Sequence, residues 1–505
     1  MGEDASITDK GVAMKSTMNS NLNRGLKGRH MSMIALGGAI GTGLFMGSAG
    51  GLASAGPAGL LVAYVITGSL VFFVLCGLAE MAAYMPITGS FAAYCERFVD
   101  PALGFAIGWT YWFSWTVAAG AEFVATGILV SYWLPGTPQY IWGIISAAIV
   151  FGLNIFHVKG FGEAEFWFAL IKVIMIIAFI IVGICVVCGW LGGVKYGFTN
   201  WKINGTPFVD GAKGTIFSFV FAIYSFLGSE TIGLTAGESR NPRKDVPAAV
   251  FSLFYRIVLF YIISIFIMGL IIPSNDPTLS TLGLANVKVA PFTQVFVKAK
   301  IPAADHIVNA VVLTSVLSAC NAAMYATSRM IYSLYHNNQA PRFLAITSKN
   351  GVPYIALILS VFLGLMFVLL AALVENAYLF LVNVGGVIGM FSWIATAIVH
   401  IFFRRAYTLQ GFDIKSLPYR APLYPFGPYF ALLTLGVVLG GQIYVVSTST
   451  QKPIEKVSTL IGIPLFVLLY VVYKIVKKTK IVKSMDVDLV TDSTNLIDYT
   501  TDTVV

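Results

Sequence analysis

Four ionisable residues lie inside long apolar stretches of the sequence. They are Glu80, Glu122, Lys172 and Glu230. An ionised side chain deep in a lipid bilayer is costly unless it is paired or hydrated, so each residue is a candidate for function. Glu230 is predicted to contact a cationic substrate, carry a proton or stabilise nearby backbone. Glu122 is predicted to form a second anionic cavity wall or to carry a proton. Buried hydrogen bonding alone is the alternative for both.

The other two ionisable residues suggest coupling and gating. Lys172 stands in an apolar run, where its ammonium group could take the place of a sodium ion or release a proton. We favour proton coupling, and snorkelling of the side chain to the membrane surface is the alternative. Glu80 lies late in its apolar stretch, close to a loop, and is predicted to make a structural or gating contact.

Two interruptions break apolar stretches that lie far apart in the chain. The first has glycines at positions 37, 38, 41 and 43, and the second is Gly228-Ser229-Glu230. Glycine-rich backbone forms helix poorly, and unwound backbone persists inside a membrane only where protein or water satisfies its polar groups. Close helix packing is the alternative for the glycines alone. Interrupted helices in corresponding positions of two halves indicate an inverted-repeat transporter that binds its substrate between them.

Peptide groups at the two interruptions predict a clamp for an α-amino acid. Free amides at Gly41, Thr42 and Gly43 begin the second half of a helix, where they and the helix dipole suit a carboxylate. Carbonyl groups freed at the opposite half-helix ends suit an ammonium group. Phe226 and Tyr111 are aromatic candidates for gating, with simple packing as the alternative. The predicted substrate-binding residues are Ala39, Ile40, Gly41, Thr42, Gly43, Glu122, Tyr224, Ser225, Leu227, Gly228, Ser229 and Glu230.

The composition identifies the elements that must hold these residues. Of 505 residues, 57% are hydrophobic and 11% are charged, whereas a soluble protein carries about 25% charged residues. This excludes an ordinary soluble protein and predicts an all-α, polytopic membrane protein of one domain. Apolar runs between breaks predict twelve transmembrane helices. These cover residues 31–54, 58–84, 103–133, 139–157, 165–192, 212–238, 247–272, 304–334, 353–374, 377–403, 427–448 and 458–477.

Positive charge gives the predicted orientation. Loops on the side of the two tails carry 23 Lys and Arg residues, against 8 on the opposite side. Because cytoplasmic loops hold the excess, both termini of this multi-pass cell-membrane protein are predicted to be cytoplasmic. We expect an N-terminal tail at 1–29, a transmembrane domain at 30–479 and a solvated, acidic tail at 480–505. Within the domain, repeats at about 30–192 and 212–403 precede two extra helices at 427–477.

The same residues exclude several other functions. The net charge of +9 follows from the loop pattern, so no basic face remains for nucleic acid. The five cysteines and five histidines lack metal-ligand spacing, and no Walker nucleotide motif is present. We therefore expect no enzyme activity, no metal and no cofactor, with protons as the coupling ion. A channel is a rival, although it would need a continuous polar pore. The oligomeric state stays open.

Longer strings in the chain resemble a known transporter family. They are Gly41-Thr42-Gly43-Leu44-Phe45, Pro86-Ile87-Thr88-Gly89-Ser90-Phe91, Gly160-Phe161-Gly162-Glu163-Ala164-Glu165, Leu170-Ile171-Lys172-Val173, Ala236-Gly237-Glu238-Ser239 and Leu417-Pro418-Tyr419-Arg420. Over about residues 22–480 the chain resembles amino acid permeases of the amino acid, polyamine and organocation superfamily, with lysine-specific permeases as the nearest branch.

This resemblance implies a leucine-transporter-like fold with an inverted five-helix repeat, and import of an amino acid with protons by alternating access. It implies that Thr42 and Gly43 bind the substrate carboxylate. The carbonyl groups of Tyr224, Ser225 and Leu227 would bind the α-amine. Lysine is the favoured substrate, with other cationic amino acids beside it.

The resemblance also implies roles for several charged residues. Lys172 would stand in a vacated sodium site. Glu230 and Glu238 match paired acidic positions of lysine permeases, and Asp276 is another acidic candidate, with a neutral Asn275 beside it. The alternatives are a permease of the same family for an aromatic amino acid, histidine, proline or γ-aminobutyrate, and a membrane amino acid sensor on the same fold.

Overall fold

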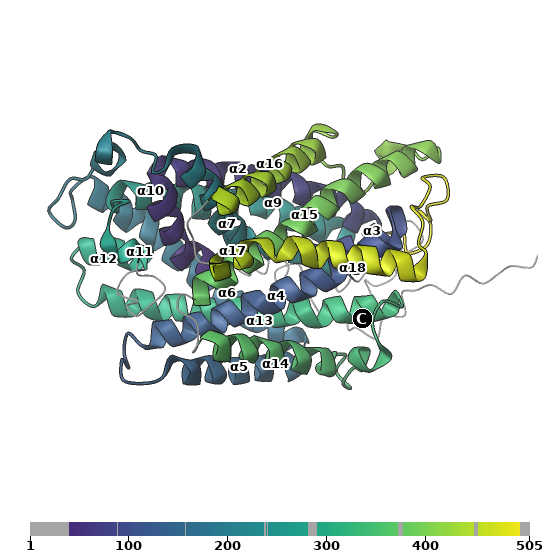
Figure 1. The fold of residues 1–505 in the computed structure, drawn as a ribbon, viewed down its shortest axis with the longest axis horizontal. Helices are drawn as coiled ribbons and strands as arrows, with labels where there is room; N and C mark the ends of the chain where they lie inside the picture. The colour runs from purple at the N-terminus through teal and green to yellow at the C-terminus, as the bar shows by residue number, and fades with distance from the viewer. Residues whose placement is uncertain are drawn as a thin grey trace, which may run out of the picture.

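The protein is an elongated bundle of helices, seen here in a computed structural model (Figure 1). The structure describes residues 40–87, 89–156, 158–236, 239, 241–280, 290–371, 377–448 and 453–494. Across these ranges every named element is helical, and Thr347 and Pro353 form an isolated β-bridge. The predicted all-α fold class is therefore confirmed.

The helices follow the predicted apolar runs in order. They are η1 (Gly43–Gly47), α2 (Ser48–Tyr84), α3 (Ser90–Phe98), α4 (Pro101–Val130), α5 (Gln139–Phe156), α6 (Val158–Val187), η2 (Thr199–Gly205), α7 (Gly211–Phe226), α8 (Thr231–Ala236), α9 (Pro242–Tyr255), η3 (Arg256–Ile262), α10 (Ile263–Ile271), α11 (Pro277–Ser280), α12 (Pro291–Lys298), α13 (Ala304–His336), η5 (Arg342–Ala345), α14 (Tyr354–Ala371), α15 (Ala377–Leu409), η6 (Ile414–Ser416), α16 (Phe426–Thr448), α17 (Pro453–Leu460) and α18 (Gly462–Lys477).

Nine helices in the described part of the chain are long and apolar enough to cross a membrane. The first runs from Gly43 to Tyr84 and contains the second predicted span and the later part of the first. They meet at Gly56, whose φ of 74° lies in the left-handed region and whose missing side chain lets Pro207 approach. The count of twelve is reached only when this helix is divided at Gly56 and the shorter α5 and α18 are included.

Two short helices lie where the sequence predicts loops. α3 follows the second predicted span, and α12 precedes the eighth. Both are too short to cross a membrane, which needs about 20 residues. Because α3 and α12 are short, the long apolar runs of the sequence do not predict them.

Packing divides much of the bundle into two groups. In one, α7 packs against η1 and α2, and α9 also packs against α2. In the other, α4, α5, α13 and α14 pack against one another. The first group contains both interrupted helices, so the boundary between the groups is where the interruptions meet the rest of the protein.

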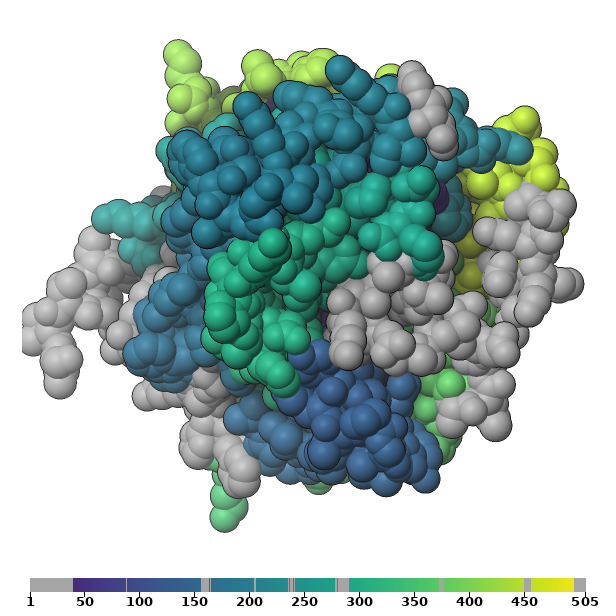
Figure 2. All heavy atoms as spheres, turned by 90° about the vertical axis from the view of Figure 1, so that its left-hand side faces the viewer, coloured from purple at the N-terminus to yellow at the C-terminus, as the bar shows by residue number. Residues whose placement is uncertain are grey.

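Apolar side chains also cover the outside of the bundle. Ile174, Ile177, Ile181 and Ile184 of α6 are all exposed, at intervals that place them along one helix face. Such a face suits lipid. Figure 2 shows one end of the molecule, where segments near residues 130, 200 and 300 lie at the surface.

Part of the predicted solvated tail, residues 482–494, lies on the end of the bundle beside α3, with Val487, Leu489 and residues 492–494 buried (Figure 1). The Tyr84 hydroxyl donates to the Leu489 carbonyl at 2.8 Å, and Leu489 is buried. Arg97 forms an ion pair with Asp492 at 3.0 Å. The acidic composition suggested solvent exposure, but the tail's carbonyl groups and one carboxylate meet donors on the bundle.

Candidate functional site

The first interruption ends at Thr42, because the π-helix η1 begins at Gly43. The chain bends at Gly41, and Thr42 caps the π-helix η1. The Thr42 amide donates to Glu122 Oε1 at 3.2 Å, and the Thr42 hydroxyl donates to the same oxygen at 2.8 Å. The amide predicted to bind a carboxylate therefore binds one from α4. Ala39 lies outside the described residues.

The second interruption separates α7 from α8. α7 ends at Phe226, Gly228 has a φ of 95°, and helix resumes at Thr231. Glycine suits this left-handed backbone because it has no Cβ. The predicted carbonyl groups of Tyr224 and Ser225 lie in the last turn of α7, where the Tyr224 carbonyl accepts from the Leu227 amide at 3.3 Å.

The first interruption touches the last turn of α7, just before the second interruption. A Cβ added at Gly43 would meet the backbone of Ser225 at 2.7 Å from Cα and 2.9 Å from N, so only glycine fits. The Ser225 hydroxyl in turn bonds the Tyr64 hydroxyl at 2.6 Å. Segments from the first and sixth predicted spans thus form one structural unit, as the paired interruptions predicted.

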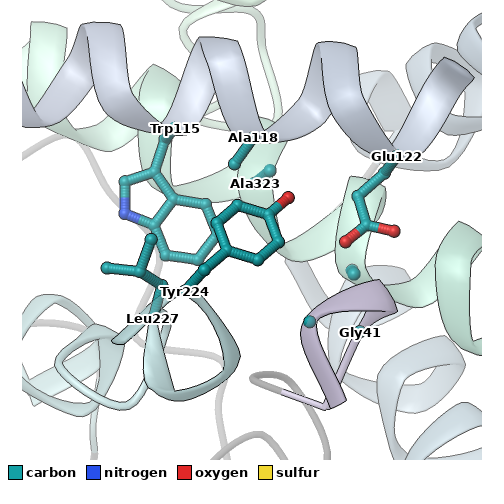
Figure 3. Close-up of a pocket in the computed structure, with 9 residues that line it drawn as sticks. Gly41, Trp115, Ala118, Glu122, Tyr224, Leu227 and Ala323 are labelled. Carbon is teal, nitrogen blue, oxygen red and sulfur yellow. The ribbon is translucent and has the colours of Figure 1, made fainter. Parts of the chain in front are cut away.

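A cavity lies between this unit and the second packing group. In Figure 3, Glu122 points from α4 toward Gly41, while Tyr224 and Leu227 come from the opposite side. The cavity volume is about 30 Å³, which is room for roughly one or two water molecules. The cavity must therefore widen to admit an amino acid. Its lining residues are Gly41, Gly43, Trp115, Ala118, Glu122, Tyr224, Leu227, Ala319 and Ala323.

Glu122 is the ionisable carboxyl group in this lining. Its side chain is 4% exposed, and within the described part of the chain its Oε2 atom has no hydrogen-bond partner. A buried polar atom without a partner is unusual and calls for an explanation. Here the atom belongs to a group that lines a cavity, where a bound molecule could supply the missing bond.

Glu230 lies outside the cavity lining. Its Oε1 accepts from the Gly228 amide at 3.3 Å and the Tyr111 hydroxyl at 3.2 Å. Its Oε2 accepts from the Trp393 indole at 3.1 Å. Three roles were predicted for Glu230, and these hydrogen bonds support stabilisation of the unwound backbone. They do not test its predicted contact with a cationic substrate.

Arg256 is a buried cation that sequence reasoning missed. It begins η3, and its guanidinium donates to the Ser229 hydroxyl, with Glu230 as an electrostatic neighbour. The available signal was an arginine within the apolar run from 247 to 272. Its position places a positive charge behind the second interruption, beside the carboxyl group that holds the unwound turn.

Lys172 lies behind the cavity, fully buried between α6 and α13. Its ammonium donates to the Ser318 hydroxyl at 2.8 Å, and Ser318 donates to Glu165 at 2.6 Å. Both Glu165 and Glu122 are electrostatic neighbours of Lys172. Glu165 was not predicted as a site residue, although it stands two helical turns before Lys172 and hence on the same face.

Two of the remaining candidates, Glu80 and Asp276, lie apart from the cavity lining. Glu80 accepts from Arg404 at 2.7 Å and from the Ala421 amide at 2.6 Å, as expected for a structural contact. Asp276 lies in the turn between α10 and α11. Glu238 is outside the described residues.

The two gating candidates pack around the second interruption. Phe226 stacks on Tyr261 with 4.3 Å between ring centroids, and Tyr111 contacts Phe91 at 4.8 Å. Neither lines the cavity. Gating by these rings stays a prediction. The residues of the described ranges include no group of three metal-ligating side chains.

Comparison with known proteins places these features in context. Residues 30–485 match the model of the family described as amino acid permease. The chain is 43% identical to the lysine-specific permease LysP of Escherichia coli, over 93% of this chain and 96% of the relative. It is 40% identical to the histidine permease HisP of Lactococcus lactis, over 93% of this chain and 98% of the relative.

A solved structure shares the fold. The crystal structure of a mutant manganese transporter from Eremococcus coleocola superposes with a TM-score of 0.58 at 12% identity. The match covers 94% of this chain and 99% of the other. This likeness confirms the predicted leucine-transporter-like fold and, at so low an identity, says nothing about substrate.

Proposed function

The chain belongs to the amino acid permease family and is a multi-pass membrane protein, and from this we propose that it imports lysine together with protons. Other cationic amino acids would be secondary substrates. Import would proceed by alternating access, with the cavity opening to each side of the membrane in turn. Both termini would lie in the cytoplasm, as the loop charges predict.

The observation that carries this proposal is the pair of bonds from Thr42 to Glu122. The amide and hydroxyl of Thr42 form a carboxylate-binding site at the start of a helix, and this site faces a cavity. A substrate carboxylate would take these donors, and the carbonyl groups at the end of α7 would accept from its ammonium group. The site thus suits the backbone of an amino acid.

Proton coupling follows from competition for the same donors. Hydrogen bonds to an ionised carboxylate are stronger than those to a neutral one. Protonation of Glu122 would therefore weaken its hold on Thr42 and free the donors for a substrate carboxylate. A proton and an amino acid would then bind together more readily than either alone, which is the requirement for symport.

Lysine is favoured by two observations. Lysine-specific permeases of Escherichia coli and Lactococcus lactis are each 43% identical to this chain over more than nine-tenths of its length. Among the described residues, the cavity lining also contains no basic side chain that would repel a cationic substrate. The histidine permease of Lactococcus lactis stands close behind at 40%, so another substrate within the family is the main alternative.

The test is transport by the purified protein in proteoliposomes. We expect labelled lysine to accumulate when an inward proton gradient is imposed and to do so without sodium. Competition by all twenty amino acids would define the substrate, and stronger inhibition by neutral aromatic amino acids than by lysine would make the substrate assignment wrong. Saturable counterflow would exclude a channel, and transport itself would exclude a protein that only senses amino acids.

A further inference from the structure

A row of buried polar side chains leads away from Lys172, and its members are not among the residues that line the cavity. Lys172, Ser318 and Glu165 are each fully buried. Beyond them, Asn321 donates to Glu165 Oε2 at 3.5 Å, and Asn154 donates to Asn321 at 2.8 Å. These groups belong to α5, α6 and α13, and none of them lines the cavity.

The hydrogen bonds in this row have a fixed direction. An ammonium group only donates, so the Ser318 oxygen must accept from Lys172. Ser318 has one hydroxyl hydrogen, and that hydrogen points to Glu165 Oε1. The serine therefore accepts from the cation and donates to the acid, which is the arrangement that passes a proton from one to the other.

We propose that Lys172, Ser318 and Glu165 form a proton relay behind the substrate cavity. This inference rests on the proposed proton coupling. In the step, a proton leaves the Lys172 ammonium for the Ser318 oxygen, while the hydroxyl proton of Ser318 passes to Glu165 Oε1. Lys172 becomes a neutral amine, Glu165 becomes a neutral carboxylic acid and Ser318 is unchanged. One proton has moved, and the net charge of the three groups is the same.

The relay runs from the neighbourhood of Glu122 toward one end of the bundle. On the cavity side, Lys172 has Glu122 of α4 as an electrostatic neighbour. On the other side, Glu165 is about two helical turns nearer the start of α6 than Lys172 is. Loop charges assign that end to the cytoplasm. Other charged or titratable neighbours of Lys172 are Arg256 of η3 and Cys320 of α13.

The decisive variant is Ser318→Ala, which removes the bridging hydroxyl. In proteoliposomes we expect lysine uptake driven by a proton gradient to fall about tenfold or more, because a positioned proton-transfer group is lost. Lysine counterflow without a gradient needs no net proton movement and should be unchanged. Ser318→Thr keeps a hydroxyl and should restore the driven uptake.

A control and a second variant separate the relay from a structural role. Ser315→Ala alters a buried serine one turn away whose hydroxyl donates to its own helix at Val311, and it should change neither assay. Glu165→Gln can still accept from Ser318 but cannot take up its proton. It should reproduce the loss of driven uptake while lysine binding persists.

Each outcome decides a different statement. If wild-type uptake ignores the proton gradient, the proposed coupling and the relay are both wrong. If wild-type uptake follows the gradient and Ser318→Ala follows it equally well, the relay alone is wrong. Equal loss of driven uptake and counterflow in Ser318→Ala and Ser318→Thr would show that Ser318 acts only in packing, and this too would overturn the relay.

Discussion

The two interrupted helices are stabilised in different ways. At the second interruption, the unwound turn carries its own carboxyl group, since Glu230 accepts from the amide of Gly228 only two residues away. At the first, the donors of Thr42 are held by Glu122, which comes from another helix 80 residues along the chain. One interruption is closed by a local contact, and the other depends on a distant residue.

This difference suggests that the interruptions have different functions. The carboxyl group of Glu230 has three protein donors and no place in the cavity lining. Glu122 accepts from Thr42 with one oxygen, its other oxygen has no hydrogen-bond partner among the described residues, and it lines the cavity. We therefore interpret the second interruption as a fixed support, and under the proposed function the first holds the carboxyl group that a substrate would replace.

Glu230→Ala gives the largest effect that this comparison predicts. It leaves three buried donors without their acceptor, and each such loss costs about 1 to 3 kcal/mol. We expect the free energy of unfolding in detergent to fall by about 3 kcal/mol or more. The matched variant is Glu122→Ala, which should cost less because water in the cavity can reach the Thr42 donors. Equal losses in the two variants would contradict the assignment of one interruption as fixed and the other as exchangeable.

Glu122→Gln should change the pH dependence of substrate binding. Raising the pH ionises Glu122 and strengthens its hold on Thr42, so wild-type affinity for lysine should fall as pH rises. With one linked proton the fall approaches about tenfold per pH unit across the titration. In Glu122→Gln the affinity should stay constant over the same range. Calorimetry of the purified wild-type and variant proteins measures the lysine affinity at each pH.

The control for this experiment is the same chemical change at the other interruption. Glu230→Gln keeps an acceptor near Gly228 and leaves Glu122 intact, so it should retain the wild-type pH dependence. A loss of pH dependence in Glu230→Gln with none in Glu122→Gln would reverse the roles assigned to the two interruptions.

Trp393→Phe probes a single donor of the fixed support. The indole donates to Glu230 Oε2 at 3.1 Å, and phenylalanine fills most of the same space without a donor. We expect unfolding to require about 1 to 2 kcal/mol less free energy, in line with one lost buried hydrogen bond. The pH dependence of lysine binding should not change, because the Thr42 site is untouched.

Local chemistry explains why much of the site was predictable from sequence. Glycines inside an apolar run and a carboxyl group within a membrane span are visible in short windows, so the interruptions, Glu122 and Lys172 were identified. The positions of Arg256 and Glu165 depend on helices that meet only after folding. Sequence reasoning placed both Glu122 and Glu230 at the cavity, but it could not determine which of them lines it.

The smallest expected effect comes from Thr42→Val, which removes the hydroxyl and keeps the amide. At low pH Glu122 is neutral and competes little, so loss of one donor to the substrate carboxylate should weaken lysine binding by about two- to tenfold, or about 0.5 to 1.5 kcal/mol. At high pH the same change also weakens Glu122, the competitor, and the two losses partly cancel. The affinity difference between low and high pH should therefore narrow. Thr42→Ser keeps both donors and should preserve the wild-type difference. If Thr42→Val weakened lysine binding equally at both pH values, Thr42 would bind the substrate without competition from Glu122. The proposed replacement of Glu122 by the substrate carboxylate would then be wrong.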